Sequence, residues 1–83
     1  MFIIESIFEE DYIFEILKKK WLLRQYKKTK NNILTWNFWW SDFRYRHPKK
    51  DKVLYFRINK QFRVFCYLEW KSLIVFELNN YQN

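Results

Sequence analysis

The apolar residues near the start of the chain recur every three or four positions, which predicts an amphipathic helix. These residues are Phe8, Tyr12, Ile13, Ile16 and Leu17. Ser6 and Glu9 have the S-x-x-E spacing of a capping box, so we expect the helix to begin at Ser6. The apolar residues Phe2–Ile4 come shortly before it and predict a short N-terminal strand.

A second helix is expected from about Trp21 to Trp36. Its apolar stripe consists of Leu22, Leu23, Tyr26, Ile33 and Leu34. An amphipathic helix has to bury its stripe, and two helices cannot do so against each other alone. We therefore expect the two helices to form a hairpin that covers one face of a β-sheet.

From Val53 onward, apolar and polar residues alternate, which is the spacing of half-buried strands. Three such runs follow one another up to Leu78 and predict a three-stranded antiparallel meander. The positions of the first two runs expected to face the helices are Leu54, Phe56, Ile58, Phe62, Val64, Cys66 and Leu68. The elements together predict one α+β domain over residues 1–83, because the chain is long enough for only one.

The apolar positions also predict which residues of neighbouring strands lie opposite each other. A three-residue loop at 59–61 pairs Phe56 with Val64 and Arg57 with Arg63. A two-residue loop would pair apolar with polar positions, so we reject it. The sequence therefore predicts two arginines side by side on the face of the sheet that is turned away from the helices.

The same reasoning, applied to a loop at 69–71, places Glu77 opposite Arg63 on the third strand. Opposed arginines repel each other unless an anion or a carboxylate lies between them. Glu77 can supply that carboxylate, in which case the row Arg57, Arg63, Glu77 is structural. Alternatively the row binds phosphate, whose oxygens match the planar fork of a guanidinium group.

The net charge of +7 is concentrated in one part of the chain. Fifteen of the 16 lysines and arginines lie between Lys18 and Arg63, where only Asp42 and Asp51 are acidic. Such a field attracts polyanions and points to a nucleic acid, RNA above all, as the partner. The alternative is a charge that serves only solubility.

Several kinds of chemistry find no support in the sequence. Cys66 is the only cysteine, which excludes an intrachain disulfide, and its place on the apolar face indicates a core residue rather than a nucleophile. We expect no metal and no cofactor, because no metal-ligand cluster or glycine-rich nucleotide loop is present. Without a basic N-terminal region or a run of about 18 apolar residues, the chain is expected to be cytoplasmic, with no membrane partner.

Two segments between the helices and the strands lack periodicity. Trp36–Phe43 is dense in aromatic residues, which suit base stacking, the docking of a partner peptide or a lid over the core. Arg44–Lys52 is basic, and Pro48 argues against regular structure there. It contains the only histidine, His47, which is a general acid or base if the loop folds over the sheet and a solvated side chain otherwise.

Residues Leu54–Phe65, LYFRINKQFRVF, resemble the central hairpin of RelE/ParE-superfamily toxins, where an R-x-[ND]-x-x-[YF]-R-[VIL] pattern is common. The order of strand, helical hairpin and three antiparallel strands is similar to that family, as is the polar tail Asn79–Gln82 with its tyrosine. The resemblance implies a RelE-like fold and a type II toxin that cleaves mRNA, usually on the ribosome. It also implies a cognate antitoxin that neutralises the toxin in a hetero-oligomer.

The cleavage that the resemblance implies needs no metal, because the RNA 2′-hydroxyl attacks its own phosphate and leaves a 2′,3′-cyclic phosphate. Arg63 matches the phosphate-binding arginine of the family, Arg57 a second basic position, and Tyr81 the C-terminal tyrosine that orients the RNA or donates a proton. Glu77 is a candidate general base. The candidate RNA-binding lysines are Lys49, Lys50, Lys52 and Lys60.

The sequence departs from the family at Asn80, where many ribonuclease members have a histidine or an acid beside the tyrosine. Two alternatives therefore stay open beside the endoribonuclease. One is a ParE-like toxin that acts on gyrase without nuclease chemistry. The other is a basic module that binds RNA or DNA without a toxic activity.

Overall fold

The computed structural model describes residues 4–35 and 43–80, apart from the side chain of Lys49. The helices are α1 (Asp11–Lys19), α2 (Leu23–Leu34) and the short 3₁₀ helix η2 (Lys49–Asp51). The strands are β1 (Ser6–Glu9), β2 (Arg44–Tyr45), β3 (Val53–Arg57), β4 (Phe62–Glu69) and β5 (Ser72–Asn80). The predicted α+β class is confirmed.

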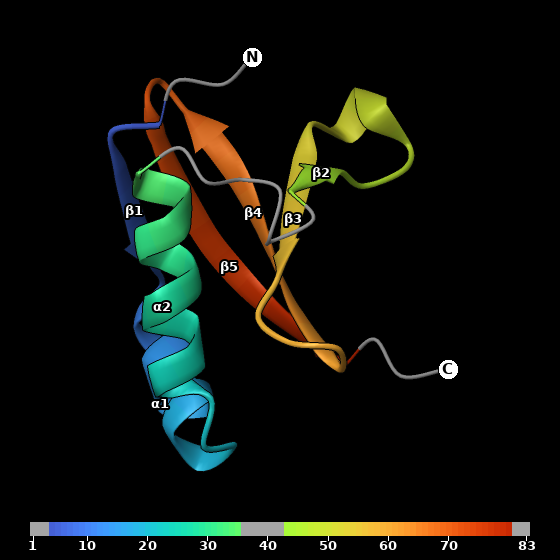
Figure 1. Ribbon diagram of the computed structural model, residues 1–83. Helices are drawn as coiled ribbons and strands as arrows, with labels where there is room; N and C mark the ends of the chain where they lie inside the picture. The colour runs from blue at the N-terminus through green and yellow to red at the C-terminus, as the bar shows by residue number, and fades with distance from the viewer. Residues whose placement is uncertain (1–3, 36–42, 81–83) are drawn as a thin grey trace.

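The five strands form one mixed sheet in the order β1-β5-β4-β3-β2 (Figure 1). The pairs β2–β3, β3–β4 and β4–β5 are antiparallel, while β1 pairs in parallel with the other side of β5. The sheet is therefore larger than the predicted three-stranded meander. The two additional strands are β1 and β2, one at each edge of the sheet. The sequence predicted the start of a helix where β1 lies and an irregular loop where β2 lies.

Both main helices pack against the same face of the sheet, and their buried side chains join one core with those of the strands (Figure 1). The helices contribute Ile13, Leu17, Tyr26 and Ile33, and Leu22, the N-cap of α2, joins them. The sheet contributes Ile7, Leu54, Phe56, Val64, Cys66, Leu73 and Val75, and Ile58 follows directly after β3. Every one of the predicted core-facing positions in β3 is buried, as are Val64 and Cys66 in β4, because strict alternation identifies the covered face.

The predicted N-terminal boundaries are wrong. Ser6 lies in β1 rather than at a helix cap, and its hydroxyl is hydrogen-bonded to that of Ser72 at 2.8 Å between the oxygens. The helix begins at Asp11, so Phe8 lies on the strand and is 56% exposed. The predicted strand at Phe2–Ile4 falls largely outside the described residues, and Ile4, which is described, is not part of a strand. A four-residue strand that pairs in parallel with β5 gives no local signal.

The second helix is also shorter than predicted. It begins at Leu23 and ends at Leu34, with Thr35 as its C-cap, and Trp36 lies outside the described residues. The basic segment Arg44–Lys52 contains regular structure after all, because β2 and η2 lie on either side of Pro48. Among the described residues, no helix has the length and apolarity that crossing a bilayer requires.

The predicted register of the β3–β4 hairpin is confirmed. Phe56 pairs with Val64 and Arg57 pairs with Arg63. The Asn59 side-chain oxygen accepts hydrogen bonds at 2.8 Å from the backbone N–H groups of Gln61 and Phe62, which holds the turn without a glycine.

The predicted register of the β4–β5 hairpin is wrong at both ends. Glu69 pairs directly with Ser72, so the turn has two residues rather than three. The register then shifts between Phe65 and Cys66, as at a β-bulge. Beyond the shift, Glu77 pairs with Phe65 and no longer with Arg63.

A partly buried ion pair joins α2 to β1. The Glu9 carboxylate is 6% exposed and accepts hydrogen bonds from the Lys30 ammonium at 2.7 Å and from the Tyr26 hydroxyl at 2.6 Å. Burial, followed by the bond to Glu9, raises the pKa of Tyr26 well above its ordinary value, so this hydroxyl stays a donor. Glu9 therefore stabilises the contact between a helix and a sheet edge instead of capping a helix.

Lys30→Met is expected to lower the free energy of unfolding by about 2 kcal/mol, because it leaves a buried carboxylate with one fewer donor. Chemical denaturation with urea measures the change. Lys27→Met is the matched control, since Lys27 is an exposed lysine of the same helix. Equal stabilities of the two variants would show that the pair contributes nothing.

Candidate nucleic-acid interface

The face of the sheet opposite the helices is here called the open face. Residues directly opposite each other on paired strands share a face, so the register defines its rows. One row consists of Arg57, Arg63 and Asn79 and is called the arginine row. The next row along the strands consists of Arg44, Tyr55, Phe65 and Glu77. The open face therefore carries three arginines within two adjacent rows.

Phe65 lies at the centre of the open face and is only 4% exposed, although no described helix covers it. The guanidinium groups of Arg46 and Arg63 lie 5.0 Å and 5.2 Å from the centre of its ring. The Tyr55 ring packs edge-on against it, with 6.2 Å between ring centroids. Arginine side chains thus cover this ring, as the helices cover the buried residues on the other face of the sheet.

These guanidinium groups lie close to the aromatic rings of the open face. Arg63 lies over Tyr55 as well, at 4.8 Å from the ring centre, and its Nε atom is buried. A stacked guanidinium contacts the ring through its face, while its N–H donors point outward in its plane. A guanidinium group of this kind can cover a ring and, through those of its N–H groups that reach solvent, donate hydrogen bonds to a phosphate.

Arg57 and Arg63, both predicted from the sequence, are brought together as expected. Glu77 is exposed and lies on the open face, but it is a diagonal neighbour of Arg63 rather than its direct partner. The residue opposite Arg63 is Asn79, which carries no charge. The prediction of a carboxylate in the arginine row is therefore wrong, because the register shift moves it one row along.

The other predicted residues lie outside this cluster. His47 is exposed in the loop after β2, and within the described part of the chain it forms no hydrogen bond or ion pair. Lys50, Lys52 and Lys60 are exposed, Lys49 belongs to η2, and Tyr81 lies outside the described residues. Three of these lysines follow one another along the β2–β3 connection.

Arg46 is the functional candidate that sequence reasoning missed. Its backbone N–H donates to the Val53 carbonyl at 2.7 Å, which continues the β2–β3 pairing and directs the side chain toward Phe65. The alternation in Phe43-Arg44-Tyr45-Arg46 was the available signal for a strand. Phe43, the one described member of the aromatic cluster Trp36–Phe43, packs against the core at 6.1 Å from the Phe56 ring.

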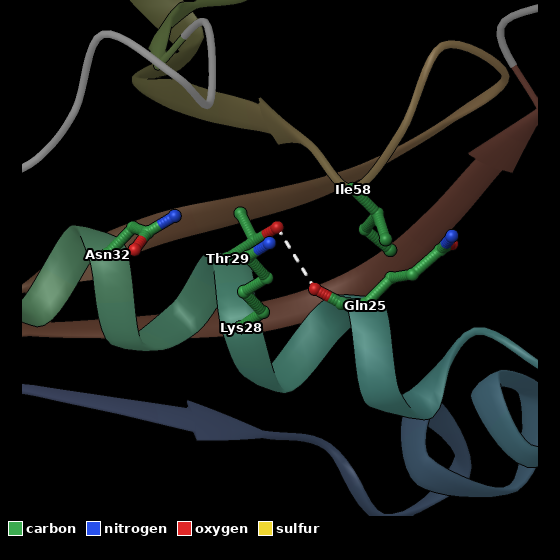
Figure 2. A pocket seen from close by; sticks show the side chains of 5 residues that line it. All are labelled: Gln25, Lys28, Thr29, Asn32 and Ile58. Carbon is green, nitrogen blue, oxygen red and sulfur yellow. Dashed lines mark hydrogen bonds between the residues drawn. The ribbon is translucent and has the colours of Figure 1, made fainter.

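A pocket of about 490 Å³ lies on the helical side of the sheet (Figure 2). Figure 2 shows Gln25, Lys28, Thr29 and Asn32 along α2, with Ile58 facing them from the end of β3. The Thr29 hydroxyl donates a hydrogen bond to the backbone carbonyl oxygen of Gln25 at 3.1 Å, so its proton is engaged within the helix. This pocket lies across the sheet from the arginine row and is separate from it.

Metal and thiol chemistry receive no support from the described residues. They contain no group of three or more histidine, cysteine and acidic side chains that could hold a metal ion. Cys66 is buried in the core, where its thiol donates to the Leu54 carbonyl at 3.6 Å. Burial raises the pKa of this thiol to about 12, so it is not a nucleophile at neutral pH.

The comparisons with known proteins do not place the chain in a family. No protein-family model matches it, and no curated protein matches it either. Any assignment of function therefore depends on the open face and on the residues that form it.

Arg46→Ala is expected to lower the free energy of unfolding by about 1 kcal/mol, because it removes the cation over Phe65 and exposes the ring. Urea denaturation, followed by far-UV circular dichroism, measures the change. Lys50→Ala removes the same charge from an exposed position of the same segment and is expected to have no effect. If both variants lose stability equally, the loss reflects charge and not the cover of Phe65.

The Cys66 thiol in the native protein is expected to react with Ellman's reagent at pH 8 about a thousandfold more slowly than in urea. The increase of its pKa from 9.0 to about 12 lowers the thiolate fraction by that factor. The unfolded chain ionises first as the pH rises above 9.0, so stability is expected to fall between pH 9.0 and about 12. A native rate equal to the unfolded rate would contradict the burial of this thiol.

Proposed function

We propose that the protein is a RelE-like type II toxin, a cytoplasmic endoribonuclease that cleaves mRNA and is neutralised by a cognate antitoxin. The observation that carries the proposal is the direct pairing of Arg57 with Arg63 on the open face. These are the two arginines of the R-x-[ND]-x-x-[YF]-R-[VIL] hairpin that the sequence shares with the RelE/ParE superfamily. The helical hairpin packed on one side of the strands supports the RelE-like arrangement.

The cleavage is a transesterification within the RNA. The 2′-hydroxyl attacks the adjacent phosphorus, the bond to the 5′-oxygen of the next nucleotide breaks, and the products are a 2′,3′-cyclic phosphate and a free 5′-hydroxyl. The phosphorane formed on the way carries more negative charge than the RNA itself. Guanidinium groups held in place before the reaction stabilise that charge without having to reorganise. Arg57 and Arg63 are assigned this role, together with Arg46, whose guanidinium group lies over the same Phe65 ring as that of Arg63.

The proton transfers need a base for the 2′-hydroxyl and an acid for the leaving 5′-oxygen. Glu77 is the carboxylate of the open face nearest in register to the arginine row, and we assign it the role of base. Tyr81 and His47 are the proposed candidates for the acid. The lysines at 49, 50, 52 and 60 are assigned to the RNA and ribosome contacts away from the scissile phosphate.

Arg63→Ala is expected to lower the rate of mRNA cleavage in a translating extract by about a hundredfold or more. Primer extension locates the cuts, and the chemistry of the new ends identifies the cyclic phosphate. Arg24→Ala is the matched control, because Arg24 is an exposed arginine of α2 on the helical side. It is expected to cleave at the wild-type rate and to remain toxic on expression.

Intact mRNA in the presence of the wild-type protein would contradict the proposal, as would full toxicity of Arg63→Ala.

Asn80, which stands where many ribonuclease members have a histidine or an acid, favours a second candidate, a ParE-like toxin of gyrase. That function predicts a DNA-damage response while translation continues. A plain nucleic-acid-binding module predicts binding that weakens steeply with salt, without growth arrest.

A further inference from the structure

The open face has a second feature, which lies at the opposite end of β4 from the arginine row. A hollow of about 330 Å³ is lined by residues of β1, β5, the end of β4 and the β4–β5 turn, and this volume is in the range of small-molecule sites. The lining residues are Phe8, Glu69, Trp70, Ser72 and Ile74. Phe8 pairs with Ile74 across the parallel strands, so both lie in one row of the open face.

Two large aromatic side chains stand at this hollow and are exposed. Phe8 is 56% exposed and Trp70 is 86% exposed, so core packing does not account for either of them. Trp70 is also in the left-handed region, with φ 61°, at the first position of a two-residue turn where glycine is favoured. A flat ring presented to solvent beside a hollow is the arrangement on which unpaired bases stack.

The hollow also contains a carboxylate acceptor that forms no ion pair within the described residues. Glu69 is exposed, and no lysine or arginine of the described residues forms an ion pair with it. The neighbouring Lys71 pairs instead with Glu5, at 3.4 Å between nitrogen and oxygen. The Ser72 hydroxyl is hydrogen-bonded to Ser6, and the Glu69 carboxylate is the charged group among the residues that line the hollow.

We propose that this hollow binds an unpaired guanine base of the RNA whose phosphates lie on the arginine row. The proposal rests on the RNA binding that the proposed function requires. Guanine has two adjacent donors on its Watson–Crick edge, N1–H and the N2 amino group, and they match the two oxygens of one carboxylate. Adenine and cytosine have one amino donor beside an acceptor there, and the single donor of uracil lies between two acceptors.

Continuity with the arginine row favours RNA over a peptide as the occupant. Arg63, Phe65, Tyr67 and Glu69 alternate along β4 and lie on one face. Glu69 lies six positions after Arg63 along the strand, which is a distance of about 20 Å. The open face is thus basic at one end and aromatic with an acceptor at the other. A single strand of about four nucleotides or more, with phosphates at one end and a splayed base at the other, complements both ends.

The experiment measures binding of fluorescently labelled 2′-O-methyl octanucleotides, which cannot be cleaved because they lack the attacking hydroxyl. The probes are oligouridine with one central guanosine, the same with adenosine, and plain oligouridine. The variants are Trp70→Gly and Glu69→Gln. Trp21→Gly is the matched control, because Trp21 is 91% exposed with φ 59° in the α1–α2 turn, at the other end of the domain (Figure 1).

The wild-type protein is expected to bind the guanosine probe at least about fivefold more tightly than the others. Trp70→Gly is expected to weaken binding of that probe at least about fivefold with an undiminished melting temperature, since glycine suits the backbone there. Glu69→Gln is expected to abolish the preference for guanosine while binding of oligouridine is kept. Trp21→Gly is expected to bind every probe as the wild type does.

Cleavage of mRNA together with unchanged probe binding by Trp70→Gly and Glu69→Gln would overturn the guanine site and leave the proposed function standing. Absence of both cleavage and probe binding in the wild type would remove the proposed function as well. Self-association of the wild type that Trp70→Gly abolishes, with probe binding unaffected, would identify a second copy of the chain as the occupant and overturn the proposal.

Discussion

Two short helices cannot cover both faces of a five-stranded sheet, and the whole arrangement follows from this constraint. The helices take the face on which Val64 and Cys66 lie, so the alternating residues Arg63 and Phe65 have to face the other way. A buried ring on that side needs a cover that is compatible with water. Guanidinium groups meet this condition, because they stack on a ring through one face and remain hydrated at their edge. The positive surface is therefore a consequence of one-sided packing.

The part of the fold that could be predicted from sequence is the part that short-range alternation specifies. The β3–β4 hairpin was predicted to the residue, because its two apolar faces agree with only one loop length. The β4–β5 hairpin could not be, since the register shift beside Phe65 interrupts the alternation on one strand only. Turns are also harder to predict in a chain without glycine. Trp70 occupies a position of a two-residue turn at which a glycine would have indicated the turn.

The candidate site divides in the same way. Arg57 and Arg63 were found because they belong to a predicted hairpin, whereas Arg46 directly follows an edge strand of two residues, where the alternation covers only four positions. The sequence predicts Glu9 as part of a capping box, because its spacing from Ser6 is the one found at helix starts, but both residues lie in β1. The Glu9 carboxylate instead joins α2 to β1, a contact between residues 21 apart that no local pattern encodes.

The parallel pairing of β1 with β5 has a consequence for synthesis. Ser6 pairs with Ser72, which is 66 residues further along the chain. Because β5 lies between β1 and β4, β1 cannot join the rest of the sheet until β5 is available. Long-range pairing of this kind makes folding slow and keeps a nascent chain incomplete. The rows of the open face that include residues of β5 can therefore form only after β5 has been synthesised and has left the exit tunnel of the ribosome.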